Sequence, residues 1–181
     1  MRIITHAWAT PFGELLLGSW GEELCLCDWR YRRMRTAVDA RIQRGLGAEY
    51  VVGNSAVIVR AKEELEGYFN GERKEFSIPL RLVGTPFQRT VWQALLNVPY
   101  GTASTYQGLT QQVAEPTAIR AVASANGANG LSIFVPCHRI IGRVGALVGY
   151  AGGLSAKRQL LQLEGAMSTT TPDLFSYEQA S

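Results

Sequence analysis

The spacing of apolar residues changes near Gly84, and this change divides the chain into two parts with different folds. Before Gly84, apolar and polar residues alternate in short runs, which is the pattern of strands. After Gly84, apolar residues recur every three or four positions, as they do on helices. Over 181 residues this predicts an α+β protein with a small N-terminal α/β domain (1–83), a mostly helical domain (84–165) and a C-terminal tail (166–181).

The first part is expected to be a small α/β domain without a cluster of reactive groups. Three alternating runs separated by tight turns predict a three-stranded meander, and helical spacing before Asn70-Gly71 predicts a helix. Cys25 and Cys27 lie two apart in the third run, so we expect both on one buried face. The expected elements are strands over 2–9, 14–17 and 24–29, a helix over 54–69, a helix of uncertain extent within 30–47, and a strand or extended connector over 76–82.

The second part is expected to contain a helix-turn-helix. A first helix runs from Pro86 toward Pro99, and two shorter helices follow over 106–113 and 118–126. Two helices joined by a three-residue turn are typical of proteins whose second helix enters a nucleic-acid groove. The expected N-caps are Thr85 for the first helix, Ser104 or Thr105 for the second, and Thr117 for the third.

The last of these helices has few bulky side chains. Arg120 is its only long charged residue, and Ala118, Ala121 and Ser124 are among its small ones. A thin helix can approach a groove closely without reading bases. The alternative is that the small residues pack this helix tightly against a neighbouring helix.

Charge and composition limit the class of protein. The formal charge is +3, and residues 85–165 hold six basic against two acidic side chains, so a polyanionic partner would bind the second part. No apolar run approaches the roughly 18 residues that span a bilayer, and the N-terminus lacks a signal-peptide core. Three cysteines and two histidines give neither a disulfide scaffold nor a zinc pattern. We therefore expect a cytoplasmic protein with no membrane segment, metal or cofactor.

Cys137 stands out as a candidate nucleophile. An apolar run ends at Pro136, which places Cys137 at a turn or helix start. A helix N-terminus and the nearby Arg139 and Arg143 would favour the thiolate. His138 is adjacent in sequence, so a water relay between the two side chains is more natural than direct contact. An acid should orient His138; of Glu115 and Glu164 we favour Glu164, which closes an amphipathic helix over 154–163.

These residues resemble a known family. Pro136-Cys137-His138-Arg139, together with Asn126-Gly127, Asn129-Gly130, the run Gly149-Tyr150-Ala151-Gly152-Gly153 and the terminal Leu163-Glu164-Gly165, is similar to O6-alkylguanine-DNA alkyltransferase, also called methylated-DNA–protein-cysteine methyltransferase. The likeness is greatest to the bacterial Ogt type and is dense from Gly84 to Gly165. It implies a ribonuclease-H-like N-terminal domain and a winged-helix DNA-binding domain. It also implies DNA repair by single-turnover, irreversible transfer of an alkyl group from O6 of a flipped guanine to Cys137.

The resemblance implies a role for each matching residue. His138 would relay a proton through water, Glu164 would polarise it, and Asn129 would be a hinge, although Asn129-Gly130 is also an ordinary turn dipeptide. Tyr106 would flip the base and donate a proton to it, while Arg120 would fill the gap left in the duplex. The helix carrying Arg120 would lie in the minor groove through Ala118, Ala121 and Ser124. The base pocket would be formed by Tyr150, Ala151, Ile140 and Ser132. The Ala151 N–H and the carbonyls of Cys137 and Ile140 would hold the edge of the base.

Several matters stay open from the sequence. Ser132 stands where some family members have a proline that lines the pocket, so the tolerance of bulky O6 groups such as benzyl is left open. The use of O4-alkylthymine as a substrate is also left open. A non-enzymatic lesion sensor and a turnover hydrolase using Cys137 are the rival functions; the sensors of this type lack the cysteine. The partner is expected to be duplex DNA bound by a monomer. In the tail, residues 171–175 faintly resemble peptides that bind sliding clamps.

Overall fold

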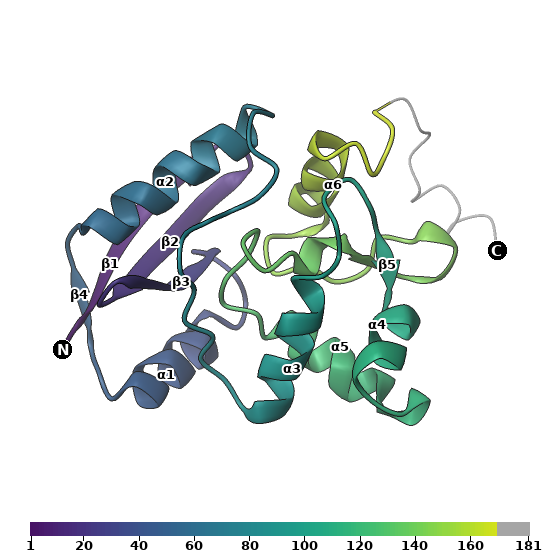
Figure 1. Cartoon of the computed structure of the whole chain (residues 1–181), viewed down its shortest axis with the longest axis horizontal. Coiled ribbons are helices and arrows are strands. Elements are labelled where there is room, and N and C mark those ends of the chain that lie inside the picture. The colour runs from purple at the N-terminus through teal and green to yellow at the C-terminus, as the bar shows by residue number, and fades with distance from the viewer. Residues whose placement is uncertain (170–181) are drawn as a thin grey trace.

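The computed structural model describes residues 1–169, which form a sheet domain and a helical domain packed against each other (Figure 1). The sheet domain contains β1 (Ile3–Thr10), β2 (Gly13–Trp20), β3 (Glu23–Trp29) and β4 (Tyr50–Val52) in the order β3-β2-β1-β4. The meander β1-β2-β3 is antiparallel, as predicted. The three-residue β4, parallel to β1, was missed because so short a run carries no periodicity.

Two helices cover opposite faces of this sheet. α2 (Ala56–Phe69) begins at Ser55, whose Oγ accepts a hydrogen bond from the N–H of Ile58, and packs over one apolar cluster. α1 (Arg35–Leu46) packs over a second cluster and ends at Gly47, whose φ of 57° suits glycine. A helix was therefore correctly expected within 30–47, and its uncertain start falls at Arg35.

The prediction that Cys25 and Cys27 share a face was wrong. The pairing of β2 with β3 shifts register between Gly18 and Ser19, so β3 carries one extra residue there. An extra residue reverses the alternation of side chains beyond it. Both cysteines are buried as expected, but Cys25 packs in the cluster under α1 and Cys27 in the cluster under α2.

Residues 70–85 cross from one domain to the other as a connector. Leu80 forms only an isolated bridge with Leu24, and the Leu24 N–H donates to the Pro79 carbonyl at 2.9 Å. Of the two alternatives for 76–82, the extended connector is therefore correct. It runs beside the edge strand β3 before the chain enters α3 (Figure 1).

The second domain is built on three helices that pack against one another: α3 (Pro86–Leu95), α4 (Tyr106–Val113) and α5 (Ile119–Gly127). Thr85 and Gln88 form a reciprocal capping box at the start of α3, and Thr105 rather than Ser104 caps α4. Thr117 does not cap α5; it lies inside the 3-10 turn η1 (Pro116–Ala118), and no side chain caps the helix. The predicted helix-turn-helix is confirmed with this correction.

The remaining elements complete the helical domain. The short strands β5 (Ser104–Thr105) and β6 (Ile140–Ile141) pair in parallel, and α6 (Leu154–Leu163) packs against the turn η2 (Cys137–Arg139). A further turn, η3, spans Arg143–Gly145. Within residues 1–169 no helix is both long enough and apolar enough to cross a membrane. The clamp-like residues 171–175 lie outside the described residues.

Candidate active site

Cys137 is the first residue of the turn η2 and faces a cavity of about 290 Å³ between the two domains. Pro136 precedes it, and the turn begins where the sequence predicted one. The cysteine is only 4% exposed, so a ligand must enter this cavity to reach the sulfur. The lining comprises Arg32, Arg33, Met34, Tyr106, Ala123, Asn126, Gly127, Cys137, Gly149, Tyr150 and Ala151.

The surroundings of the thiol differ from those expected. Burial raises the pKa of Cys137 above its usual value, and the neighbouring Asp28 adds to this. The Nδ2 of Asn129 donates to the sulfur at 3.2 Å, and with the charges of Lys157 and Arg32 it acts in the opposite direction. The expected favouring of the thiolate by a helix end, Arg139 and Arg143 was therefore wrong. The raised pKa favours the protonated thiol over the thiolate.

His138, the next residue of the turn η2, is paired with a carboxylate. It is fully buried, and its Nε2 lies 2.7 Å from Oε1 of Glu164. Burial lowers the pKa of His138 despite the nearby carboxylate, which favours the neutral ring. Because an ionised carboxylate only accepts hydrogen bonds, Nε2 carries the proton that faces Glu164. Its Nδ1 is buried without a hydrogen-bond partner among residues 1–169, which leaves a lone pair ready to accept a proton.

Glu164 holds more than His138. Arg139 donates to it through Nε at 2.8 Å and Nη2 at 2.9 Å, and the hydroxyl of Tyr68 donates at 2.7 Å. Burial works to raise the pKa of Glu164, but the hydrogen bonds and charges of His138 and Arg139 outweigh it and lower the pKa to about 2. Arg139 is thus the counterion of this buried carboxylate. Glu164, not Glu115, is the partner of His138, as expected.

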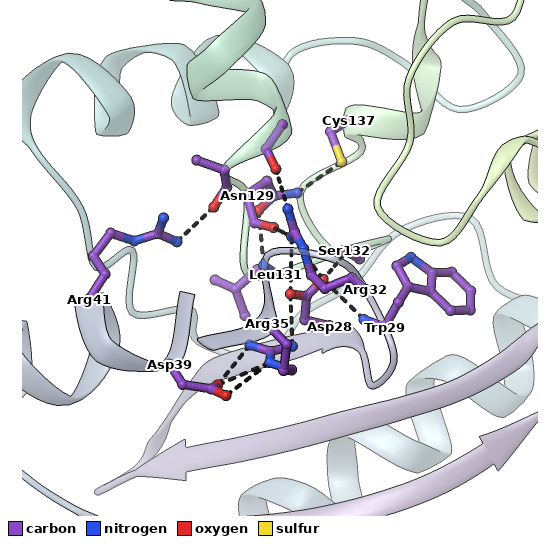
Figure 2. Close-up of polar contacts among 12 residues, drawn as sticks. Asp28, Trp29, Arg32, Arg35, Asp39, Arg41, Asn129, Leu131, Ser132 and Cys137 are labelled. Carbon is purple, nitrogen blue, oxygen red and sulfur yellow. Dashed lines mark hydrogen bonds and ion pairs between the residues drawn. The ribbon is translucent and has the colours of Figure 1, made fainter. Parts of the chain in front are cut away.

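Asn129 ties the reactive turn to the end of α5. Besides its contact with Cys137, its Nδ2 donates to the Val135 carbonyl at 2.9 Å, and its Oδ1 accepts from the Leu131 N–H. Figure 2 shows this side chain pointing from the loop after α5 toward the sulfur. Asn129 is 2% exposed, so it is more than a surface turn residue.

One face of α5 packs inward and the other is exposed. Val122 and Ala125 are buried, and the Ala125 carbonyl accepts from Trp92 Nε1 of α3 at 2.8 Å. On the outer face, Arg120, Ala121 and Ser124 are exposed, and Ala118, the last residue of η1 directly before the helix, is half-buried. The two readings of the small residues are therefore compatible, since tight packing and a thin outer face occur on the same helix.

Tyr106, Tyr150 and Ala151 lie in the cavity wall as expected. The Tyr106 hydroxyl donates to the Val148 carbonyl at 3.3 Å, and Trp29 Nε1 donates to the Tyr150 hydroxyl at 3.1 Å. A Cβ on Gly152 would lie 2.5 Å from the Trp29 ring, which explains why this loop requires glycine beside Ala151.

Two predicted pocket residues lie elsewhere. Ser132 is fully buried, and its Oγ donates to Asp28 Oδ1 at 3.2 Å, so its side chain does not line the cavity. The Ile140 carbonyl, which was expected to hold the edge of the base, accepts a hydrogen bond from Lys157 Nζ instead, and Ile140 is not among the cavity-lining residues. Both residues support the cavity from behind instead of lining it.

Sequence analysis missed four residues around this cavity. Lys157 is fully buried and donates to the carbonyls of Ile140, Val148 and Gly149, which anchors the loop leading to Tyr150. The sequence offered only a single lysine in an amphipathic helix as a signal. The other three lie in the loop between β3 and α1 and are Arg32, Arg33 and Met34. Their signal in the sequence was the basic run that starts at Arg30.

The described residues fit no metal centre: within 1–169 no three His, Cys, Asp or Glu side chains are grouped to hold an ion. A single thiol lines the cavity, and the helix α5 of the helix-turn-helix contributes to the same lining, which together fit a class of DNA-binding proteins with a cysteine in the binding cavity. Comparison with known proteins narrows that class. Residues 3–82 match the ribonuclease-like domain, and residues 86–166 the DNA-binding domain, of 6-O-methylguanine DNA methyltransferase. The chain belongs to this family of DNA-repair methyltransferases.

Individual relatives agree across most of the chain. The methylated-DNA–protein-cysteine methyltransferase of Mycobacterium leprae is 41% identical over 169 residues, which cover 92% of this chain and 94% of the relative. That of Haemophilus influenzae is 41% identical over 87% of this chain and 83% of its own length. A crystal structure of Mycobacterium tuberculosis OGT in complex with DNA superimposes with a TM-score of 0.77 at 38% identity, covering 92% of this chain and 94% of that one.

Proposed function

We propose that this protein repairs duplex DNA by moving an alkyl group from O6 of guanine to Cys137 in a single irreversible step. The observation that carries the proposal is the cavity lined by Cys137, whose sequence neighbour His138 pairs with Glu164. The names of the relatives, methylated-DNA–protein-cysteine methyltransferase, give a cysteine as the acceptor in those proteins. Here Cys137 is the cysteine that such a cavity offers.

The proposed chemistry is a displacement at carbon. The thiol proton passes through a water to Nδ1 of His138, and Glu164 stabilises the imidazolium that forms. The thiolate then attacks the alkyl carbon, a C–S bond forms, and the C–O6 bond breaks with its electron pair left on the guanine. Tyr106 donates a proton to the base and is reprotonated from solvent. The thioether has no good leaving group, so the protein is consumed.

DNA would bind along the outer face of α5. Ala118, Ala121 and Ser124 leave room for a close approach in the minor groove, and exposed Arg120 would occupy the space of the flipped base. Contacts outside the pocket would fall on phosphates, so binding should be nearly sequence-blind and weaken steeply with salt. A monomer provides this whole surface.

The pocket would read guanine mainly through the backbone. The Ala151 N–H and the Cys137 carbonyl lie on residues that line the cavity, with Tyr150 as one wall. Methyl and other short alkyl groups are the proposed substrates, and O4-alkylthymine is a secondary one. Because Ser132 is turned toward Asp28, the limit on bulky groups would come from Met34 at the cavity instead.

Intact mass of the protein tests the proposal. After incubation with excess duplex containing O6-methylguanine, we expect the mass to rise by one methylene and no further, with one guanine restored for each protein molecule. Peptide mapping should place the addition on Cys137. A protein that binds the lesion without a mass change would be a sensor, and one that restores several guanines per molecule would be a hydrolase.

Arg120→Ala is expected to impair repair within the duplex. Loss of a side chain that fills the gap should make the flipped state less populated and slow transfer from duplex by about tenfold or more, since base flipping costs a few kcal/mol. Transfer from free O6-methylguanine base, which needs no flipping, should keep its rate. Arg89→Ala removes the same charge from an exposed position of α3 and serves as the control. If transfer from duplex slowed equally in Arg120→Ala and Arg89→Ala, Arg120 would contribute only a general positive charge.

A further inference from the structure

We propose that Arg32, held by Asp28 of the N-terminal domain, is a positioning residue that fixes Asn129 against Cys137. The inference rests on the proposed function, because it concerns how the same thiol is set for transfer. It assigns the sheet domain, which carries no nucleophile, a part in the reaction. Figure 2 shows the residues that connect the end of β3 to the sulfur.

The connection begins with a buried ion pair. Asp28 is the penultimate residue of β3 and fully buried, and Arg32 Nη1 lies 3.0 Å from its Oδ2. The same guanidinium crosses to the other domain, where Nη1 donates to the Asn129 carbonyl at 3.1 Å and Nη2 donates to the Gly127 carbonyl. A planar guanidinium suits this task, since it can serve a carboxylate and two carbonyls at once in fixed directions.

Further bonds hold the segment that Arg32 grips. The Cys27 N–H donates to the Gly130 carbonyl at 2.9 Å, the Ser132 N–H donates to the Cys27 carbonyl, and the Ser132 hydroxyl donates to Asp28. Cys27 and Leu131 thereby form a parallel bridge, so the loop extends the edge of β3. Residues 127–132 are therefore held by the N-terminal domain through side chains and backbone together.

The backbone of Ile133, which follows residues 127–132, shows that their contacts with the N-terminal domain constrain the reactive turn. Ile133 has a φ of 74°, a left-handed conformation that β-branched residues rarely adopt. Such a conformation persists only where the surrounding structure imposes it. Ile133 stands between the gripped segment and Cys137, while Asn129 spans the same interval through its bonds to Val135 and to the sulfur. The position of the Asn129 amide thus depends on where its backbone is held, and Arg32 holds it.

The chain offers a matched control in Arg35. This arginine also pairs with Asp28, at 2.8 Å, and with Asp39, so its loss removes a charge from the same carboxylate. Its hydrogen bonds within residues 1–169 all go to the N-terminal domain, whereas Arg32 also donates to the carbonyls of Gly127 and Asn129 in the other domain. If the substitutions only weakened the structure around Asp28, transfer would slow in both Arg32→Met and Arg35→Met. If Arg32 positions Asn129, transfer would slow only in Arg32→Met.

The experiment compares Arg32→Met and Arg35→Met with the wild-type protein. The readouts are the rate of transfer from O6-methylguanine duplex, the pH midpoint of Cys137 alkylation by iodoacetamide followed by peptide mass, and thermal stability. For Arg32→Met we expect transfer about tenfold slower or more and a midpoint raised by about one unit, because the loosened Asn129 and the lost charge both disfavour the thiolate. Arg35→Met should lose stability while its rate and midpoint stay near those of wild type. Arg32→Lys should recover the rate only in part.

Two outcomes would overturn the inference, and both differ from failure of the proposed function. If Arg32→Met and Arg35→Met show the same rate and the same midpoint, Arg32 only joins the domains. If Arg32→Met slows transfer without moving the midpoint, the defect lies outside the Asn129–Cys137 contact. Failure of the proposed function would instead appear in the wild-type protein, as absence of any transfer from the lesion.

Discussion

Replacing Cys137 with serine is expected to abolish alkyl transfer while preserving binding to duplex DNA. A serine hydroxyl is a far weaker acid than a thiol, and the neutral hydroxyl is a poor nucleophile toward an alkyl carbon, so the rate should fall by a factor on the order of 10⁴ or more. The smaller Oγ can still accept from Asn129 Nδ2, which keeps the turn satisfied. The measurement is transfer of a labelled methyl group from duplex DNA, with lesion binding followed in parallel.

Cys25→Ser is the control for this variant. Cys25 is another buried thiol, packed under α1 in the other domain, and is not among the residues that line the cavity. Burial raises its pKa to about 12, so it cannot supply a thiolate near neutral pH. We expect Cys25→Ser to lose stability but to keep one transfer per folded molecule. Residual transfer by Cys137→Ser, or loss of transfer in Cys25→Ser, would contradict the assignment.

Local sequence patterns predicted the helical domain well because each helix carries its own signals. Thr85 with Pro86 marks the start of α3, and the turn at 114–116 separates α4 from α5. Thr117 misled because it sits in a 3-10 turn, where a residue with capping chemistry has no free helix N–H to accept. In the sheet, the register shift beside Cys25 left no trace in the sequence, since a bulge depends on the pairing partner.

The site was predicted where sequence neighbours decide it and missed where packing decides it. Cys137 and His138 are adjacent, and Glu164 was the better placed of two candidate acids, so their grouping could be predicted. The environment of the thiol could not be predicted, because it depends on which arginine pairs with each buried carboxylate. Glu164 pairs with Arg139, and Asp28 pairs with Arg32. Asp28 and Arg32 belong to the N-terminal domain, which was expected to contain no cluster of reactive groups.

Replacing Glu164 with glutamine is expected to damage both stability and repair. The neutral amide would leave the buried Arg139 without its counterion, at a cost of about 3 kcal/mol or more in unfolding free energy. It would also no longer stabilise the protonated His138, so transfer should slow by about 10²-fold. Chemical unfolding and single-turnover rates measure the two effects.

The same variant should change how stability depends on pH. The folded pKa of Glu164, about 2, lies below the unfolded value of about 4.3, so its contribution is present above pH 4.3 and is lost as the pH falls toward 2. Wild type should therefore lose more stability than Glu164→Gln over that interval.

Tyr68→Phe separates the charge of Glu164 from its hydrogen bonding. The Tyr68 hydroxyl donates to the same oxygen that His138 contacts, yet it carries no charge and does not touch the cavity. Its loss should cost about 1 kcal/mol of stability, the ordinary value for a single hydrogen bond, and leave the transfer rate nearly unchanged. If Glu164→Gln behaved no worse than Tyr68→Phe in rate, the carboxylate would serve the fold alone, and His138 would act without it.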